Sequence, residues 1–122
     1  MEQVTIRNVT RATVIGTRIA VADTAFTRLI GLLGRRGLER DAGLWIRPSS
    51  GVHTFGMLFP IDVIALDGKL RVCAAWQRLR PWRISGVSWG IHSVIELPAG
   101  SIERINIQRG DQLEVVQTPR EA

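Results

Sequence analysis

Apolar and polar positions along the chain predict a mainly β protein. Residues 4–6 and 12–21 are rich in β-branched side chains and partly alternate between apolar and polar positions, which predicts a hairpin-like pair of strands. Residues 61–66 are apolar at both alternating sets of positions apart from Asp62, as in a strand covered on both faces. The dipeptide at 67–68, Asp-Gly, then signals a tight hairpin turn. Further short strands are predicted at residues 44–46, 70–77, 92–97 and 112–117.

Helical patterns are short. Over residues 24–34, Phe26, Leu29, Ile30 and Leu33 follow the spacing of a buried helical stripe. A helical turn is also expected after residue 98, with Ser101 as its cap. About seven or eight short strands separated by turn signals predict a jelly-roll-like sandwich or distorted barrel with one or two short helices. We expect a single domain over residues 3–118.

Composition agrees with an ordinary globular domain. Of the 122 residues, 45% are hydrophobic and 22% are charged, which argues against a disordered chain or a collagen-like repeat. The only cysteine, Cys73, lies in an apolar stretch and excludes a disulfide scaffold. The chain begins without an apolar run behind a basic segment and contains no long apolar run. We therefore expect a cytoplasmic protein that does not contact a membrane.

The charge balance is basic but diffuse. The chain has 16 Lys and Arg residues and 11 Asp and Glu residues, which gives a net charge of +5. All the basic residues except Lys69 are Arg. This balance permits contact with nucleic acid or with anionic ligands. The basic residues are spread from Arg7 to Arg120, whereas a nucleic-acid-binding protein is expected to concentrate them in a stripe.

A series of short motifs resembles a known family. In chain order the motifs are RLIGLLGR at 28–35, VHTFGM at 52–57, PIDV at 60–63, LD at 66–67, ELPAG at 96–100 and GD at 110–111. Together they resemble the DUF192 family, a domain of unknown function common in bacteria and archaea, over nearly the whole chain. The resemblance implies a mainly β jelly-roll-like sandwich or distorted barrel and brings no established reaction. Leu58 stands where similar members often carry a basic residue, so the resemblance implies no anion contact at that position.

Residues 53–62 are the first candidate for a binding site. His53, Thr54 and Asp62 supply an imidazole, a hydroxyl and a carboxylate that could orient a ligand, and Phe55 and Met57 could line the cleft. Alternatively, the same polar groups bond to loop backbone, and the neighbouring Gly and Pro residues shape a bend. The carboxylate, at the start of an apolar strand, must find a partner or face a cleft.

Two charged residues elsewhere could belong to the same cleft. Arg28 lies on one helical stripe with Arg35 and would either balance Asp62 or meet an anionic ligand. Glu96 could face the cleft beside Asp62, where paired carboxylates would require the two side chains to lie close together. Both arginines could equally tie the helix to carboxylates within the fold.

The segment 78–90 suggests a different kind of function. It combines basic and aromatic side chains that could contact phosphates and stack on bases, or dock on a protein partner: Arg78, Arg80, Trp82, Arg83 and Trp89. The alternative is that Trp82 folds back onto the barrel as a lid while the arginines stay solvated. No nucleic-acid-binding fold signature accompanies the segment.

The sequence offers little support for catalysis. His53 and His92 are the only histidines, and neither has a metal-binding spacing, so we expect no metal and no cofactor. No nucleophile motif is present. We therefore favour a domain that binds a small, potentially anionic ligand over an enzyme. An acid/base pair of His53 and Asp62 is left as a third hypothesis that requires the two within hydrogen-bond reach. Both a monomer and a dimer remain open.

Overall fold

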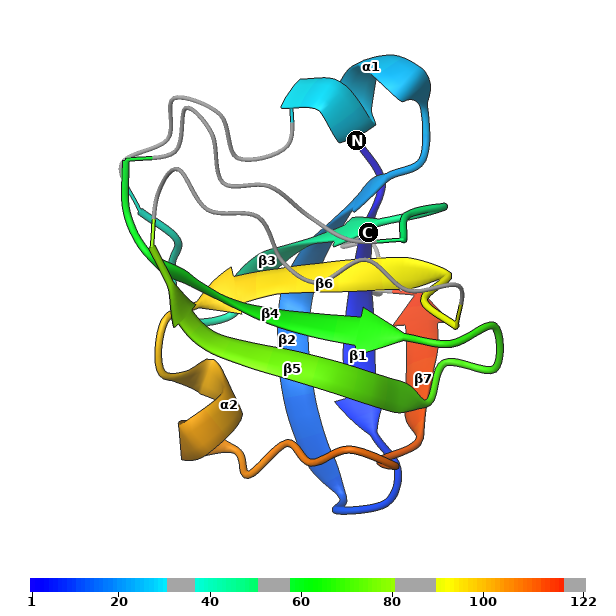
Figure 1. The fold of residues 1–122 in the computed structure, drawn as a ribbon, viewed down its shortest axis with the longest axis vertical. Helices are drawn as coiled ribbons and strands as arrows, with labels where there is room; N and C mark the ends of the chain where they lie inside the picture. The colour runs from blue at the N-terminus through cyan, green and yellow to red at the C-terminus, as the bar shows by residue number, and fades with distance from the viewer. Residues whose placement is uncertain (31–36, 51–57, 81–89, 118–122) are drawn as a thin grey trace, which may run out of the picture.

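A computed structural model describes residues 1–30, 37–50, 58–80 and 90–117 (Figure 1). These residues contain one seven-stranded sheet in the order β5-β4-β6-β3-β2-β1-β7 and two short helices, α1 (Ala25–Ile30) and α2 (Ser101–Arg104). The strands are β1 (Gln3–Asn8), β2 (Thr13–Ala22), β3 (Ala42–Ile46), β4 (Ile61–Leu66), β5 (Val72–Leu79), β6 (Ser93–Pro98) and β7 (Leu113–Gln117). The prediction of a mainly β fold with one or two short helices is confirmed.

The sheet curls until its two edge strands meet. Neighbouring strands are antiparallel except for the parallel pair β2 and β3. In Figure 1, β4, β5 and β6 cross in front of β1, β2 and β7. Residues Arg71 and Gln112 form a bridge between the edges, and the Leu113 amide donates to the Leu70 carbonyl at 2.9 Å. These bonds close a distorted barrel at one point and satisfy edge groups that would otherwise be unpaired.

Each face of the sheet buries its own apolar cluster. The inner cluster fills the barrel and includes Ile64 and Leu97, together with Ile102 from α2. The outer cluster lies on the opposite face and includes Leu44 and Val63. Every residue of β4 is buried, so the prediction of a strand covered on both faces is confirmed.

The two ends of the barrel differ. At one end, on the left in Figure 1, α2 follows β6 and packs Ile102 against the inner cluster. The N-cap of α2 is Gly100, whose φ of 93° suits glycine, and the Ser101 hydroxyl donates to the Pro98 carbonyl at 2.6 Å. The prediction that Ser101 caps this helix is therefore wrong. At the other end lies the hairpin turn between β4 and β5, which begins at Asp67 as predicted.

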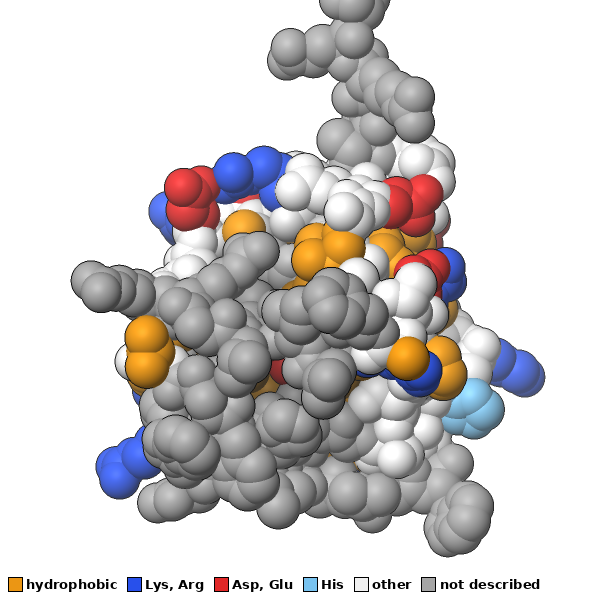
Figure 2. All heavy atoms as spheres, turned by 90° about the horizontal axis from the view of Figure 1, so that it is seen from above, with side chains coloured by type: hydrophobic (Ala, Val, Ile, Leu, Met, Phe, Trp, Pro, Cys, Tyr) orange, Lys and Arg blue, Asp and Glu red, His pale blue; other side chains and the backbone are white. Residues whose placement is uncertain are grey.

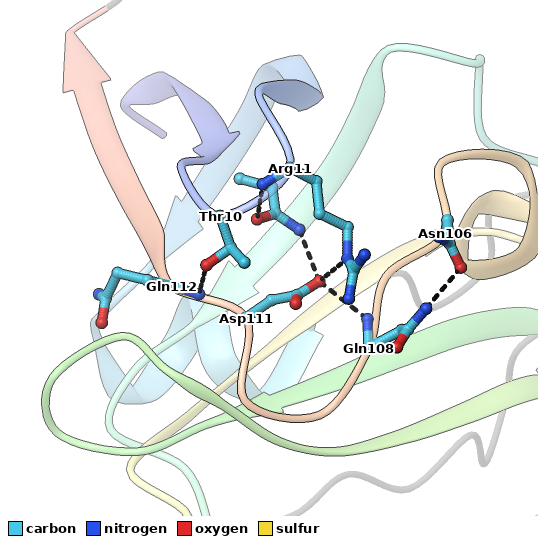
Figure 3. Close-up of polar contacts among 7 residues, drawn as sticks. Thr10, Arg11, Asn106, Gln108, Asp111 and Gln112 are labelled. Carbon is cyan, nitrogen blue, oxygen red and sulfur yellow. Dashed lines mark hydrogen bonds and ion pairs between the residues drawn. The ribbon is translucent and has the colours of Figure 1, made fainter.

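A buried aspartate ties three segments together near the closure of the sheet (Figure 3). Asp111 is 2% exposed, and its Oδ2 atom accepts hydrogen bonds from Asn8 Nδ2 at 2.8 Å, Arg11 Nε at 2.8 Å and the Gln108 amide at 2.9 Å. The bonds join the end of β1 and the following turn to the segment that leads into β7. Asp111 is therefore a structural residue of the barrel.

The helices are far from membrane dimensions. No helix among the described residues is long and apolar enough to span a bilayer.

Candidate functional site

The described part of the chain contains only some of the residues predicted to form the site. His53, Thr54, Phe55 and Met57 lie outside the described residues, so their placement stays a prediction. Asp62, Glu96 and Arg28 are described, and their surroundings decide which of them can meet a ligand.

Asp62 has a structural role, because both of its side-chain oxygens bond to backbone amides. Its side chain is fully buried, its Oδ1 atom accepts a hydrogen bond from the Arg78 amide at 2.8 Å, and its Oδ2 atom accepts one from the Ile102 amide at 2.8 Å. The carboxylate thereby joins the start of β4 to the bulged end of β5 and to the first turn of α2. It supplies the capping contact that the side chain of Ser101 does not make.

Arg28 does not balance Asp62, so that prediction is wrong. Its guanidinium donates to two backbone carbonyls instead, to Thr24 from Nε at 3.3 Å and to Pro48 from Nη1 at 3.1 Å. The bond to Pro48 ties α1 to the segment after β3. The reason is the position of α1, which lies away from the end of the barrel where Asp62 meets α2 (Figure 1).

Glu96 occupies the middle of the outer face. Its Cα position pairs with Leu44 on β3 and with Val63 on β4, and the same row continues to Ala20 on β2 and Trp76 on β5. Side chains in such a row share one face of the sheet. The residue is 2% exposed, so its carboxyl group is buried among apolar neighbours.

Asp62 and Glu96 point to opposite faces. Asp62 pairs with Leu97, which belongs to the inner cluster, whereas Glu96 pairs with Val63 of the outer cluster. Because successive side chains of a strand alternate between faces, the two carboxyl groups are separated by the sheet itself. The prediction that Glu96 faces a cleft beside Asp62 is therefore wrong, and paired-carboxylate chemistry between them is ruled out.

The carboxyl group of Glu96 is incompletely satisfied. Its Oε2 atom is buried and has no hydrogen-bond partner. Burial raises the pKa of this group from 4.5 to about 8, because the ionised form loses its hydration. At neutral pH the group is therefore protonated and can both donate and accept a hydrogen bond.

This protonation predicts a pH-dependent stability. Folded Glu96 holds its proton up to about pH 8, whereas the unfolded chain releases it near 4.5, so the free energy of unfolding should fall as the pH rises through that window. The limiting slope for one proton is about 1.4 kcal/mol per pH unit. Glu96→Gln should flatten this dependence in urea titrations at several pH values. A Glu114→Gln control, on an exposed position of β7, should retain the wild-type slope; an unchanged slope in Glu96→Gln would contradict the assignment.

The outer face also has a hollow, which lies beside β2 and β3. It has a volume of about 270 Å³ and is lined by Gln3, Ala20 and Leu38, with the ion pair of Arg18 and Glu39 beside it. Ala20 pairs with Leu44, which in turn pairs with Glu96. Gly43, the residue before Leu44, allows β3 to approach β6 closely, because a Cβ atom there would lie 2.7 Å from the Glu96 carbonyl oxygen.

The alternative interaction segment is described only in part. Trp82, Arg83 and Trp89 lie outside the described residues. Arg78 is exposed, and its guanidinium reaches Glu103 of α2 at 3.5 Å. Arg80 is also exposed. On the face shown in Figure 2, the described basic side chains stand apart from one another, several with acidic neighbours, so no continuous basic patch is visible there.

The described residues give no support to metal binding or to an acid/base pair of His53 and Asp62. Among the described residues, no three His, Cys, Asp or Glu side chains are grouped to hold a metal ion. His53 lies outside the described residues, and both carboxylate oxygens of Asp62 already accept backbone hydrogen bonds.

Comparison with known proteins identifies the family. The family model for DUF192, described as "Uncharacterized ACR", matches residues 5–115. The chain belongs to the DUF192 family. The resemblance inferred from the motifs is thereby confirmed, and the function of this family is not established.

Two sequence relatives are archaeal proteins named UPF0127. The chain is 36% identical over 112 residues to the protein of Thermococcus sibiricus, covering 88% of this chain and 71% of the relative. It is 30% identical over 112 residues to the protein of Pyrococcus furiosus, covering 88% of this chain and 94% of the relative. Neither name states a ligand or a reaction.

Solved structures show the same fold in bacterial proteins. A protein of unknown function from Novosphingobium aromaticivorans superposes with a TM-score of 0.78 at 21% identity, covering 92% of this chain and 83% of that one. A Sinorhizobium meliloti protein gives a TM-score of 0.75 at 21% identity, covering 93% of this chain and 92% of that one. At this identity the likeness shows the DUF192 fold alone.

The sequence indicated Glu96 as a candidate site residue but did not indicate which side chains surround it. Leu44, Val63 and Trp76 lie on three different strands, and only the strand order brings them into one row with Glu96. The available signal was a single acidic residue within the apolar run Val94 to Leu97. Such a residue indicates a buried carboxyl group, although it does not indicate which strands cover it.

Proposed function

We propose that this DUF192 domain binds a small, largely apolar molecule on the outer face of its barrel, with Glu96 making the main polar contact. The observation that carries the proposal is the buried Oε2 atom of Glu96, which lacks a hydrogen-bond partner in an apolar row. Buried polar groups are normally paired, and an unpaired one costs about 1–3 kcal/mol. A ligand that supplies the missing partner recovers this cost on binding.

The protonation state of Glu96 suggests the polar group of the ligand. A neutral carboxyl group donates through its O–H and accepts through its carbonyl oxygen, so it complements a carboxylic acid, a carboxylate or a primary amide. A carboxylate ligand would meet the earlier expectation of an anionic molecule, because it can accept the Glu96 proton in a hydrogen bond. The apolar side chains of Leu44, Val63 and Trp76 would contact the remainder of the ligand.

The role proposed here is binding, without a reaction. Among the described residues, the Cα partners of Glu96 are apolar, and they offer no second group to exchange protons with it. Asp62 supports the site indirectly, because it fixes the start of β4 and thereby the strand that carries Val63.

Isothermal titration calorimetry with hexanoate and hexanamide as ligands tests the proposal. We expect at least one of them to bind the wild-type protein at pH 6.5 and to bind Glu96→Leu about tenfold or more weakly, as expected for the loss of a buried hydrogen bond. Hexanamide does not titrate in this range, so any weakening of its binding above about pH 8 would report the ionisation of Glu96. Glu114→Gln should bind as the wild type does.

Two outcomes would count against this proposal. One is the absence of heat for both probes with the wild-type protein. The other is equal affinity of the wild type and Glu96→Leu, which would place any binding elsewhere on the molecule.

A further inference from the structure

The open end of the barrel contains a larger hollow than the outer face. Its volume is about 400 Å³, within the range of small-molecule sites, and the mouths of β-barrels are common locations for such sites. It is formed where β2, β3 and β4 end and β6 begins. The described side chains that give it chemical character are Asp23, Trp45, Arg47, Asp67 and His92.

The basic side of the hollow is prearranged. Trp45 is 5% exposed, packs in the inner cluster, and has a buried Nε1 atom without a hydrogen-bond partner. The Arg47 guanidinium carbon lies 4.4 Å from the centre of its ring. Stacking orients a guanidinium plane and leaves its N–H edge available for a carboxylate. Arg47 is exposed, and no carboxylate lies within ion-pair distance of it among the described residues.

The acidic side of the hollow is prearranged as well. Oδ1 of Asp67 accepts hydrogen bonds from the Lys69 amide at 2.8 Å and the Arg71 amide at 2.9 Å. These backbone bonds, that of Arg71 foremost, hold the pKa of Asp67 below its usual value, so its carboxylate is charged at neutral pH. Asp23, a second lining carboxylate, is exposed after β2.

His92 lies between these groups along the rim. Its ring packs against the hairpin turn, because a Cβ atom on Gly68 would lie 3.3 Å from His92 Nδ1. Its amide donates to the Leu66 carbonyl at 2.8 Å, which fixes the segment before β6. The imidazole adds hydrogen-bonding nitrogen atoms to the lining.

We propose that the barrel mouth binds a small zwitterion of the α-amino-acid type, with its carboxylate at Arg47 and its ammonium group toward Asp67 and Asp23. A simple anion in this hollow would meet two carboxylates, and a simple cation would meet the stacked guanidinium. A ligand that carries both charges satisfies both sides, and the Trp45 Nε1–H is a further donor for its carboxylate. This site is separate from Glu96, whose side chain lies on the outer face of the sheet.

The test uses ligand-observed NMR with each of the standard amino acids added separately to the wild-type protein. We expect at least one to bind. The strongest is then compared with its N-acetyl derivative, which lacks the ammonium group, and with its methyl ester, which lacks the carboxylate. Each derivative should bind about tenfold or more weakly, because each loses charge-assisted hydrogen bonds.

Variants of the protein complete the test. Arg47→Gln should weaken the strongest amino acid by about tenfold or more, and Arg104→Gln, an exposed position on α2 at the opposite end of the barrel, should bind as the wild type does. Glu96→Leu should also bind the amino acid normally, which separates this site from the outer face. Absence of binding by every amino acid, full affinity of either derivative, or full affinity of Arg47→Gln would each overturn the proposal.

Discussion

Replacing Asp62 with alanine is expected to lower the free energy of unfolding by about 3–5 kcal/mol, because two backbone amides lose their buried acceptor. The carboxylate is fully buried and accepts from the amides of Arg78 and Ile102. In the variant these two N–H groups lose their partner at a buried position, which is unfavourable for polar groups. Urea denaturation followed by circular dichroism measures the change.

Two further variants show whether the loss of stability comes from the hydrogen bonds of Asp62. Asp62→Asn keeps one acceptor oxygen and should lose less stability than Asp62→Ala. Asp41→Ala, at an exposed turn position, is the matched control and should change stability by about 0.5 kcal/mol or less. If Asp62→Ala unfolds at the wild-type urea concentration, the carboxylate does not join β4, β5 and α2 as described.

Asp111→Ala is expected to cost a similar amount, about 3–5 kcal/mol, because one oxygen serves three donors. Asn8 is buried and would keep an unpaired amide, and the Gln108 amide and Arg11 guanidinium would also lose their acceptor (Figure 3). The segment that leads into β7 would then keep its backbone bonds and the hydrogen bonds that Gln112 makes with Thr10 and Lys69, but would lose all three bonds to Asp111. Thermal unfolding and urea denaturation would both show the loss.

Acid should reproduce part of this effect in the wild-type protein. Burial disfavours the ionised form of Asp111, but the hydrogen bonds from Arg11, Gln108 and Asn8 together outweigh it, so the pKa of this carboxyl lies below 3.8. The contribution of the Asp111 carboxylate to the free energy of unfolding is fully present above pH 3.8. It is lost as the pH falls through the lower pKa of the folded state. Asp111→Asn should therefore lose less stability than the wild type on acidification below about pH 4. Parallel acid sensitivity of the two proteins would contradict the role of this carboxylate.

The sequence predicts best the features that depend on neighbouring residues. The hairpin at Asp67 follows from its Asp-Gly dipeptide, and the carboxylate accepts amide protons only two and four residues ahead. The strand at 61–66 follows from an apolar pattern that needs no knowledge of its partners. Both predictions concern local chemistry, and the strand is confirmed. The hairpin forms at the predicted place, but its turn extends to Arg71 and its positive φ, 62°, falls on Leu70 and not on Gly68.

The partners of Asp62 and Glu96 depend on the whole fold. Asp62 accepts from amides 16 and 40 residues away, and any residue type can provide a backbone amide, so side-chain identities do not indicate these partners. Glu96 faces the outer row because β6 lies between β3 and β4, an order that no short motif encodes. The DUF192 resemblance gives the fold class without giving these contacts.

The strand order also determines when the sheet can be completed during synthesis. β1 lies between β2 and β7, and Val4 pairs with Gln117. The ribosome therefore releases β1 and β2 long before the second neighbour of β1 exists, and pairing of such distant segments is a slow step in folding. Until residue 117 has left the exit tunnel, one edge of β1 lacks its partner strand and can pair with other chains.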